Sequence, residues 1–375
     1  MRHIFLKHLQ SGIMIEYKVI GVMSGTSMDG VDLVHCTLNQ TNGKWNYKIN
    51  AAKTVDYDEK WRLRLSKLRS QSAYNFVRTD RYYGEYIGLL INDFLHETNL
   101  TADLISSHGH TIFHQPENNL TTQIGDGNAI SAITGIPSVT NFRAMDVILG
   151  GQGAPLVGIG DKLLFSEYDM CLNIGGFANI SANVNGNYVA YDICPANILL
   201  NRIAREFDME FDEDGKIAET GKIDYDLLAN LNNIGYYSEA YPKSLGREWI
   251  NQNFWGIVRE CKIEKQDKMK TLVDHIACQI GQNIDDLADG DSSKIKVLAT
   301  GGGVLNPVLI DYIKSNTDAE IVVPDNQLIN YKEALVFALM GVLRIQNQPN
   351  VLASFTGADS DSVSGSLHGD FSKLV

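Results

Sequence analysis

Three glycine-rich segments of the sequence each follow a short apolar run, a pattern typical of a turn at the end of a buried strand. Their glycines are Gly25, Gly30, Gly175, Gly176, Gly301, Gly302 and Gly303. A phosphate group needs backbone N–H donors that point at it and no side chains in the way, and glycine provides both. A single such turn is equally well explained by local structure, but three at strand ends favour a nucleotide site, because ligands of α/β proteins gather there.

The familiar nucleotide and nucleophile motifs are absent from the sequence. The nearest approach to GxxxxGK[ST] has the wrong gap between Gly215 and Gly221, and Ile223 follows Lys222. No GxGxxG follows a predicted strand, which argues against a dinucleotide site, and no GxSxG occurs, which argues against a serine hydrolase. We therefore expect the nucleotide to be held between two domains by hairpin turns, as in the actin and hexokinase type of ATPase fold.

Short motifs rich in glycine and polar residues occur along nearly the whole chain after Tyr17. The first is GVMSGTSMDGVD at 21–32. The others are SHGHT at 107–111, QIGD at 123–126, FR at 142–143, GGQGAPL at 150–156, NIGGFANI at 173–180, PKSLGRE at 242–248, TGGG at 300–303 and EA at 333–334. In their types and their order, these motifs resemble those of the anhydro-N-acetylmuramic acid kinase family. So many matches in the family order make the resemblance highly specific.

The resemblance implies an α/β fold: a two-domain, actin-like ATPase (ribonuclease H-like) with mixed sheets and an ATP cleft between the domains. The implied domains are 1–140 with 351–375, and 141–350. The implied reaction opens 1,6-anhydro-N-acetylmuramic acid with water and phosphorylates the freed O6 from ATP. Its products are N-acetylmuramic acid 6-phosphate and ADP, in cytoplasmic recycling of peptidoglycan. A homodimer is implied as well.

The resemblance also assigns the ATP phosphates to the segment that begins at Gly25. The residues expected around them are Thr26, Ser27, Met28, Asp29, Gly30, Val31 and Asp32, and the contacts are completed by Gly175, Gly176, Gly301, Gly302 and Gly303. The hydroxyl groups of Thr26 and Ser27 would donate to phosphate oxygens. Asp29 would position Mg²⁺ through water, because Mg²⁺ favours carboxylate and water oxygens. The alternative for Asp29 is a turn residue that hydrogen-bonds its own backbone.

Asp192 matches the catalytic aspartate of the family and stands at a predicted strand end, before a helix that Pro195 is expected to open. Glycosidic cleavage usually takes two carboxylates. Here the leaving oxygen O6 is also the phosphoryl acceptor, so the γ-phosphoryl group can replace the second carboxylate. Asp192 would then act alone, taking the proton from the water that attacks C1. The alternative is that Asp192 only caps the helix.

Arg143 is expected to pair with the lactyl carboxylate of the sugar, because guanidinium forks match carboxylates. Asp146 is expected to accept a sugar hydroxyl, and the alternative for both residues is a surface ion pair between them. His108, His110 and Asn197 are expected near the substrate. A metal site at the histidines is less favoured than a polar cluster at a strand end, because no carboxylate or cysteine accompanies them at a fixed spacing.

The chain departs from the usual family pattern at a few positions. Cys194 and Ala196 lie in DICPAN, where the family usually has DTGPGN, and His110 stands where glutamine is common. Asn330 stands where an aspartate often precedes the Glu-Ala pair. Cys194 would narrow the approach to the substrate if the lost glycine contacts it. The changes at Cys194 and Ala196 motivate one alternative, an actin-like kinase for another anhydrosugar or sugar hydroxyl. A second alternative is a non-catalytic ATP-binding relative, and the retained Asp192 argues against it.

The elements that carry these residues are predicted to alternate between strands and helices. Apolar runs predict strands at 17–22, 31–38, 104–107, 170–174, 180–184, 188–193 and 295–300. Helical spacing predicts two helices within 59–98 and others at 126–133, from Pro195, at 269–287, at 306–315 and at 332–344. Strand, glycine turn and strand occur once near the start of each expected domain, which indicates a weak internal duplication. The alternation predicts an α/β protein with mixed sheets.

Length and composition limit the class of protein further. The 375 residues predict two domains or one large one. With 45 acidic and 32 basic residues the net charge is −13, so nucleic acid and anionic membranes are not expected partners. The partner that the family resemblance implies is a small sugar. The five cysteines are widely spaced without a CxxC pair, which favours a reducing, cytoplasmic setting. No stretch approaches the roughly 20 apolar residues of a membrane helix, and the first 20 residues make a poor signal peptide.

Overall fold

The computed structural model describes residues 15–25, 28–241 and 243–374. Their contacts divide the chain into two compact units. Unit 1 comprises Met1–Leu164 and Tyr331–Val375, and unit 2 comprises Phe165–Asn330. These boundaries differ from the expected domain limits because 141–164 and 331–350 pack with the first unit. The domain limits themselves stay a prediction.

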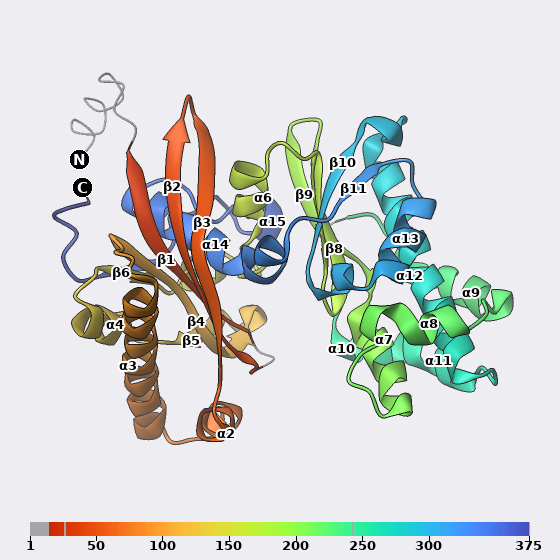
Figure 1. Cartoon of the computed structure of the whole chain (residues 1–375), viewed down its shortest axis with the longest axis horizontal. Helices are drawn as coiled ribbons and strands as arrows, with labels where there is room; N and C mark the ends of the chain where they lie inside the picture. Colours follow the sequence, from red (N-terminus) through yellow and green to blue (C-terminus); the bar gives the residue numbers. More distant parts are fainter. Residues whose placement is uncertain (1–14, 26–27, 242, 375) are drawn as a thin grey trace. The chain divides into compact units, whose positions relative to one another are not determined.

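Unit 1 contains a mixed sheet of seven strands among the described residues. They are β1 (Glu16–Ser24), β2 (Gly30–Thr41), β3 (Lys44–Asp56), β4 (Leu104–Gln115), β5 (Leu120–Ile124), β6 (Ser138–Thr140) and β12 (Ser366–His368). The strand order is β12-β6-β4-β1-β2-β3, and β5 pairs with β4. β1, β2 and β3 form two antiparallel pairs, whereas β4 is parallel to β1 and to β6. The long β1–β3 meander is drawn in red to orange in Figure 1.

Helices cover both faces of this sheet. They are α2 (Glu59–Leu68), α3 (Ala73–Thr98), α4 (Gly127–Thr134), α5 (Ala144–Ile148), α6 (Gly158–Leu164), α14 (Asn326–Ile345) and α15 (Ala353–Thr356). Ile20 and Val22 of β1 pack in one apolar cluster with the buried side of α3. Gly21 lies between them and faces α14, where an added Cβ would stand 2.0 Å from the carbonyl oxygen of Ala334. Glycine is therefore required there for the close approach of α14 to the sheet.

The two helices expected within 59–98 are confirmed. They separate at Ser72, whose side chain accepts from the N–H of Asn75 and so caps α3. Asp58 caps α2 and Asp126 caps α4 in the same way. No helix within the described ranges is long and apolar enough to cross a membrane.

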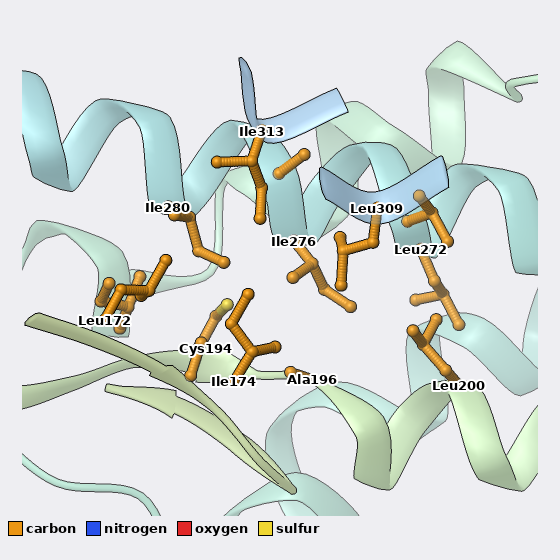
Figure 2. Packing of buried hydrophobic residues seen from close by; sticks show 14 of the residues in the cluster. Leu172, Ile174, Cys194, Ala196, Leu200, Leu272, Ile276, Ile280, Leu309 and Ile313 are labelled. Atoms are coloured by element: carbon orange, nitrogen blue, oxygen red, sulfur yellow. The ribbon is translucent and has the colours of Figure 1, made fainter. Parts of the chain in front are cut away.

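Unit 2 contains a mixed sheet of five strands among the described residues, in the order β11-β10-β7-β8-β9. They are β7 (Met170–Ile174), β8 (Phe177–Val184), β9 (Asn187–Pro195), β10 (Lys296–Thr300) and β11 (Glu320–Val322). The helices are α7 (Asn197–Ala204), α8 (Lys216–Thr220), α9 (Tyr225–Asn232), α10 (Arg247–Trp249), α11 (Trp255–Glu260), α12 (Lys265–Ala288) and α13 (Pro307–Ser315). Figure 2 shows Ile276 and Ile280 of α12 above Ile174 and Cys194 of the sheet, in one buried apolar core.

Short helical turns connect these elements. The 3-10 turns are η1 (Pro116–Asn118), η2 (Arg205–Phe207), η3 (Glu213–Gly215), η4 (Gly235–Ser238), η6 (Ser292–Lys294) and η7 (Gly302–Leu305). One turn of π-helix, η5 (Ile250–Phe254), joins α10 to α11.

Both sheets repeat one strand pattern. In β3-β2-β1-β4-β6 and in β9-β8-β7-β10-β11, the first two pairings are antiparallel and the last two are parallel. In chain order each set begins with β1 or β7, and glycine follows each of these strands directly: Gly25 after β1, and Gly175 and Gly176 after β7. The shared order supports the internal duplication that the sequence indicates.

Three local predictions need correction. The strand expected at 104–107 continues to Gln115, so the histidines of the SHGHT motif lie within β4 and not after it. β8 begins at Phe177, which leaves only two residues in the turn after β7. Pro195 does not open a helix: it ends β9, paired with Phe177, and α7 begins at Asn197. A strand end tolerates proline because no further ladder donor is needed there.

Candidate active site

Asp192 lies beside a β-bulge in β9. It pairs with Asn179 of β8, whereas Cys194 pairs with Ala178, so Ile193 is an extra residue in the ladder. Residues that pair across neighbouring strands have their side chains on the same face of the sheet. Asp192 and Cys194 pair with consecutive residues of β8, so they lie on opposite faces. Without the bulge, two residues separated by one would lie on the same face. Cys194 is fully buried in the core (Figure 2), whereas Asp192 is only partly buried.

A row of polar side chains crosses the sheet at Asp192. Asn173 of β7 pairs with Asn179 of β8, which pairs with Asp192 of β9. Sequence reasoning missed both asparagines, although each interrupts an apolar strand within the NIGGFANI motif. The side-chain oxygen of Asn173 also stands close to Gly301, where an added Cβ would be 2.6 Å from it. The row therefore connects Asp192 with the glycine turns of unit 2.

The two carboxylate oxygens of Asp192 differ in their surroundings. Oδ2 accepts a hydrogen bond from the N–H of Leu245 at 2.9 Å. Oδ1 has no hydrogen-bond partner among the described residues. Burial raises the pKa of Asp192 above its ordinary value, and the bond from Leu245 opposes that rise without cancelling it. A carboxylate with one oxygen hydrogen-bonded, the other without a partner, and a raised pKa is suited to act as a general base.

The capping alternative for Asp192 does not hold. The N-cap of α7 is Ala196, and no side chain caps this helix. Instead, the N–H groups of Ala196, Asn197 and Ile198 donate to the carbonyl oxygens of the 175–176 turn. The first N–H groups of α7 are thus satisfied by the glycine turn.

The glycines of unit 2 divide into two kinds. An added Cβ on Gly301 or Gly303 would stand within 3 Å of Ile174 atoms, so these two are needed for close packing against the end of β7. An added Cβ on Gly175 would meet nothing nearer than 3.6 Å, and the nearest atoms to Gly176 and Gly302 are 4.0 Å away. The space beside these three glycines is therefore free of side chains, as a phosphate requires. The N–H of Gly175 already donates to the carbonyl oxygen of Phe177. The atom nearest to Gly302 is Nδ2 of Asn197, the first residue of α7.

The first glycine loop is shorter than expected. Thr26 and Ser27 lie outside the described residues, and Gly30, Val31 and Asp32 already belong to β2. The Val31 side chain is fully buried, so it can offer only backbone to a ligand. Met28 has a φ of 60°, a turn conformation, and Asp29 is exposed.

Three carboxylates of unit 1 influence one another near this loop. Asp32 accepts from Oγ1 of Thr54 at 2.6 Å, and its pKa is raised by burial and by the charge of Asp29. Part of the Glu333 side chain, on α14, is exposed to solvent. Desolvation of its carboxyl group by the surrounding protein nevertheless raises its pKa, Arg143 lowers it, and the charge of Asp32 raises it further. Mutual repulsion of this kind is relieved by a cation. No group of three or more acidic, histidine or cysteine side chains in the described ranges could by itself hold a metal.

Mg²⁺ fits this donor set only as a water- and phosphate-bound ion. It commonly keeps several waters and takes one or two carboxylates together with substrate phosphates. Asp29 makes no side-chain hydrogen bond within the described ranges, so its carboxylate is available for that contact. Its alternative role as a turn residue bound to its own backbone finds no support in these ranges.

Arg143 is held by two neighbours. Its Nε–H donates to Nε2 of His108 at 2.8 Å, and Nη1 donates to the carbonyl oxygen of Gly153. Nδ1 of His108 lies 2.8 Å from the carbonyl oxygen of Gly109, so Nδ1 carries the proton and Nε2 accepts from Arg143. Burial and the Arg143 charge hold the pKa of His108 well below its usual range, which agrees with a neutral ring. Burial lowers the pKa of Arg143 to about 10, and Glu333 and Asp146 oppose this.

Asp146 is deeply buried and is not ion-paired with Arg143. Its Oδ2 accepts from the N–H of Gly153 at 2.8 Å, and its Oδ1 accepts from Oγ1 of Thr356 at 2.6 Å. The carboxylate thus fixes the GGQGAPL loop, whose Gly153 also bonds Arg143. Its contact with a sugar hydroxyl stays a prediction.

His110 begins a buried hydrogen-bonded chain. Nδ1 of His110 lies 2.8 Å from Oγ of Ser24, and that oxygen lies 2.7 Å from the hydroxyl of Tyr57. The Tyr57 hydroxyl in turn bonds that of Tyr83. Burial lowers the pKa of His110 to about 4 and raises those of both tyrosines. Because Ser24 directly precedes Gly25, this row of hydrogen bonds holds the start of the first glycine loop.

Known proteins agree with this picture. The family model for anhydro-N-acetylmuramic acid kinase matches residues 17–369. A curated anhydro-N-acetylmuramic acid kinase from Mannheimia succiniciproducens is 35% identical over 373 residues, which covers 93% of this chain and 98% of the relative.

Solved structures are more distant. Xylulose kinase from Lactobacillus acidophilus is 12% identical with a TM-score of 0.41, covering 94% of this chain and 93% of that one. The activator of 2-hydroxyisocaproyl-CoA dehydratase from Clostridium difficile, with bound ADPNP, is 14% identical with a TM-score of 0.39, covering 86% and 94%. These two likenesses carry no weight for function.

Two units that repeat one strand order, with glycine directly after β1 in one and after β7 in the other, define an actin-like α/β protein. Within that class, the family match and the curated relative each span nearly the whole chain. The chain belongs to the anhydro-N-acetylmuramic acid kinase family.

Proposed function

We propose that this chain is an ATP-dependent kinase that opens 1,6-anhydro-N-acetylmuramic acid and phosphorylates O6. The observation that carries the proposal is the carboxylate of Asp192, which has one oxygen held by Leu245, the other open, and a raised pKa. It stands on the sheet row that leads to the accessible glycines of unit 2.

The proposed reaction uses one base. Oδ1 of Asp192 takes a proton from water as the water oxygen bonds to C1 and the C1–O6 bond breaks. O6 takes the γ-phosphoryl group of ATP, and ADP leaves. The phosphoryl group thus neutralises the leaving oxygen, a task that a second carboxylate performs in ordinary glycoside hydrolysis. Phosphoryl transfer itself depends mostly on positioning and charge neutralisation.

ATP is proposed to lie against exposed backbone. Gly25 and its loop, with Gly176 and Gly302, would donate N–H groups to the phosphates. Gly175 would only keep the space beside the phosphates open, because its own N–H donates to the carbonyl oxygen of Phe177. Gly301 and Gly303 would shape the turn without contacting the nucleotide, because both pack closely on Ile174. Mg²⁺ bound to the phosphates would supply charge neutralisation, and Asp29 would hold it through water.

The sugar is proposed to bind through Arg143 and its neighbours. His108 and Gly153 occupy Nε and Nη1 of Arg143, which leaves Nη2 for the lactyl carboxylate. A guanidinium whose orientation is fixed loses little freedom on binding. Asn197 is proposed to contact the sugar or the phosphates. We also propose that the enzyme works in the cytoplasm as a homodimer.

The departures at Cys194 and Ala196 do not favour a different sugar. Both side chains are fully buried in the core of unit 2 (Figure 2). Burial raises the pKa of the Cys194 thiol, so the group is inert as well as hidden. Neither residue therefore narrows the space in front of Asp192.

The test is incubation with ATP, Mg²⁺ and 1,6-anhydro-N-acetylmuramic acid in isotope-labelled water. The expected products are ADP and a sugar 6-phosphate that carries one solvent oxygen at C1. A 6-phosphate without solvent oxygen would mean transfer to a plain hydroxyl. Absence of any sugar phosphate, with ATP still bound, would contradict the proposal.

A further inference from the structure

One stretch of unit 2 encloses the backbone of Asp192. The hydroxyl of Tyr236 donates to the carbonyl oxygen of Asp192 at 2.6 Å, and the N–H of Asp192 donates to the carbonyl oxygen of Lys243 at 3.3 Å. Leu245 adds its N–H to the carboxylate at 2.9 Å. Asp192 is therefore held at its N–H, its carbonyl group and its side chain by Lys243, Tyr236 and Leu245, which are 44 to 53 positions distant in the sequence.

Two of these residues, Lys243 and Tyr236, also contact each other. Nζ of Lys243 donates to the carbonyl oxygen of Tyr236 at 3.1 Å and lies 4.7 Å from the centre of the Tyr236 ring. Tyr241 stacks on Tyr191, the neighbour of Asp192, with 5.4 Å between ring centres. The stretch and the end of β9 thus form one packed assembly, in which Tyr236 is buried.

A buried histidine anchors the assembly from α12. Nδ1 of His275 lies 2.6 Å from Oδ1 of Asn232, an atom that also accepts from Nε2 of Gln279. Nδ1 therefore carries the proton, and Nε2 accepts from the hydroxyl of Tyr237 at 2.9 Å. His275 is fully buried, and burial lowers its pKa to about 3, which agrees with a neutral ring.

We propose that Tyr236 and Tyr237 are positioning residues for the base. The Tyr236 hydroxyl fixes the peptide group of Asp192 and with it the direction of Oδ1, and the His275–Tyr237 bond fixes the turn η4 that carries Tyr236. The proposal rests on the proposed function, because it matters only where Asp192 acts as a base. Displacement of a reacting group by about 1 Å can reduce turnover 100-fold, so a single hydroxyl at this place is expected to matter.

The test compares Tyr236→Phe and Tyr237→Phe with a matched control, Tyr17→Phe. Tyr17 is equally buried, and its hydroxyl accepts one bond from Gln346 in unit 1. We expect kcat to fall about 10- to 100-fold for Tyr236→Phe and by a smaller factor for Tyr237→Phe, with KM for ATP unchanged. The acid limb of the kcat profile should also move, because the environment of Asp192 changes. Tyr17→Phe should behave as wild type.

The outcomes separate the two proposals. A wild-type chain without sugar kinase activity overturns the proposed function and this inference with it. An active wild type with unchanged kcat and pH profile in both variants overturns the positioning roles alone. Equal losses of kcat in Tyr17→Phe would also overturn them, since the effect would then be general. If Tyr236→Phe does not fold, as judged by thermal unfolding, the more distant Tyr237→Phe decides the matter.

Discussion

The N–H of Leu245 donates to Oδ2 of Asp192 at 2.9 Å, which leaves Oδ1 as the oxygen that can receive a proton. Burial of the carboxyl group and this hydrogen bond act on its pKa in opposite directions, and burial has the larger effect. The structure thus gives this carboxylate a fixed orientation without removing its basicity, which a base needs and a purely structural carboxylate does not.

Asp192→Asn should bind ATP and lose turnover. The amide oxygen can still accept from Leu245, but the amide cannot take a proton, so we expect kcat to fall about 10²- to 10⁴-fold. A raised pKa means that the charged form is disfavoured by folding, so above that pKa the neutral amide should increase stability. Turnover, ATP titration and thermal unfolding at pH 7 measure the three effects. Retained turnover would remove Asp192 from the base role.

Asn179→Asp should move the pH dependence of catalysis. Position 179 pairs with Asp192 across β8 and β9, where a second carboxylate would repel the first and raise its pKa further, by about one unit. The acid limb of the kcat profile should shift to higher pH by the same amount. Asn183→Asp makes the same change at an exposed position of β8 and should leave the profile in place. Identical shifts in both variants would point to net charge as the cause.

Much of the fold follows from local pattern. Apolar runs and cap residues such as Ser72 and Asp126 place the strands and helices because these signals act within a few residues. The glycine turns and Asp192 were likewise accessible from spacing and family motifs.

The support of the site depends on register and tertiary contact instead. The extra residue at Ile193 decides which way Asp192 faces, and nothing in the local sequence marks that bulge. Tyr236 and Tyr237 read as ordinary buried aromatics, because their partners lie 44 and 38 positions distant. The roles of Gly175 and Gly301 also could not be separated, since only the neighbouring backbone distinguishes an open glycine from a packed one.

Arg143→Lys should weaken sugar binding. Lysine keeps the charge, but its single nitrogen cannot reproduce the planar spacing of Nε, Nη1 and Nη2, so the orientation that His108 and Gly153 impose is lost. A charge-assisted bond contributes about 1.5–3 kcal/mol, so KM for the sugar should rise about 10- to 100-fold with KM for ATP unchanged. Arg81→Lys, at the surface pair with Asp126, is the matched control. A rise in KM for ATP alone would contradict the sugar role.

His110 should matter to the ATP side of the reaction. His110→Leu leaves the Ser24 hydroxyl without its imidazole partner, at a cost of about 1–3 kcal/mol in the free energy of unfolding. Because Ser24 precedes Gly25, KM for ATP should rise in parallel. His110→Gln can bond Ser24 through its amide and should remain close to wild type in both measurements. Equal behaviour of the two variants would show that the bond to Ser24 is not what His110 contributes.

Acid should destabilise the chain through its buried neutral histidines. Burial lowers the pKa of His275 from 6.5 to about 3, so between these values the unfolded chain binds a proton that the folded chain does not. The free energy of unfolding therefore falls as pH decreases below about 6.5, by up to about 1.4 kcal/mol per pH unit for this group, and levels off near its folded pKa. Burial lowers the pKa of His110 to about 4, so His110 also reduces the free energy of unfolding as the pH falls toward that value. His275→Gln removes this titrating group. The free energy of unfolding, measured with denaturant between pH 5 and pH 7, should therefore depend less steeply on pH than in wild type. Parallel slopes would mean that His275 is not neutral and buried in the folded chain.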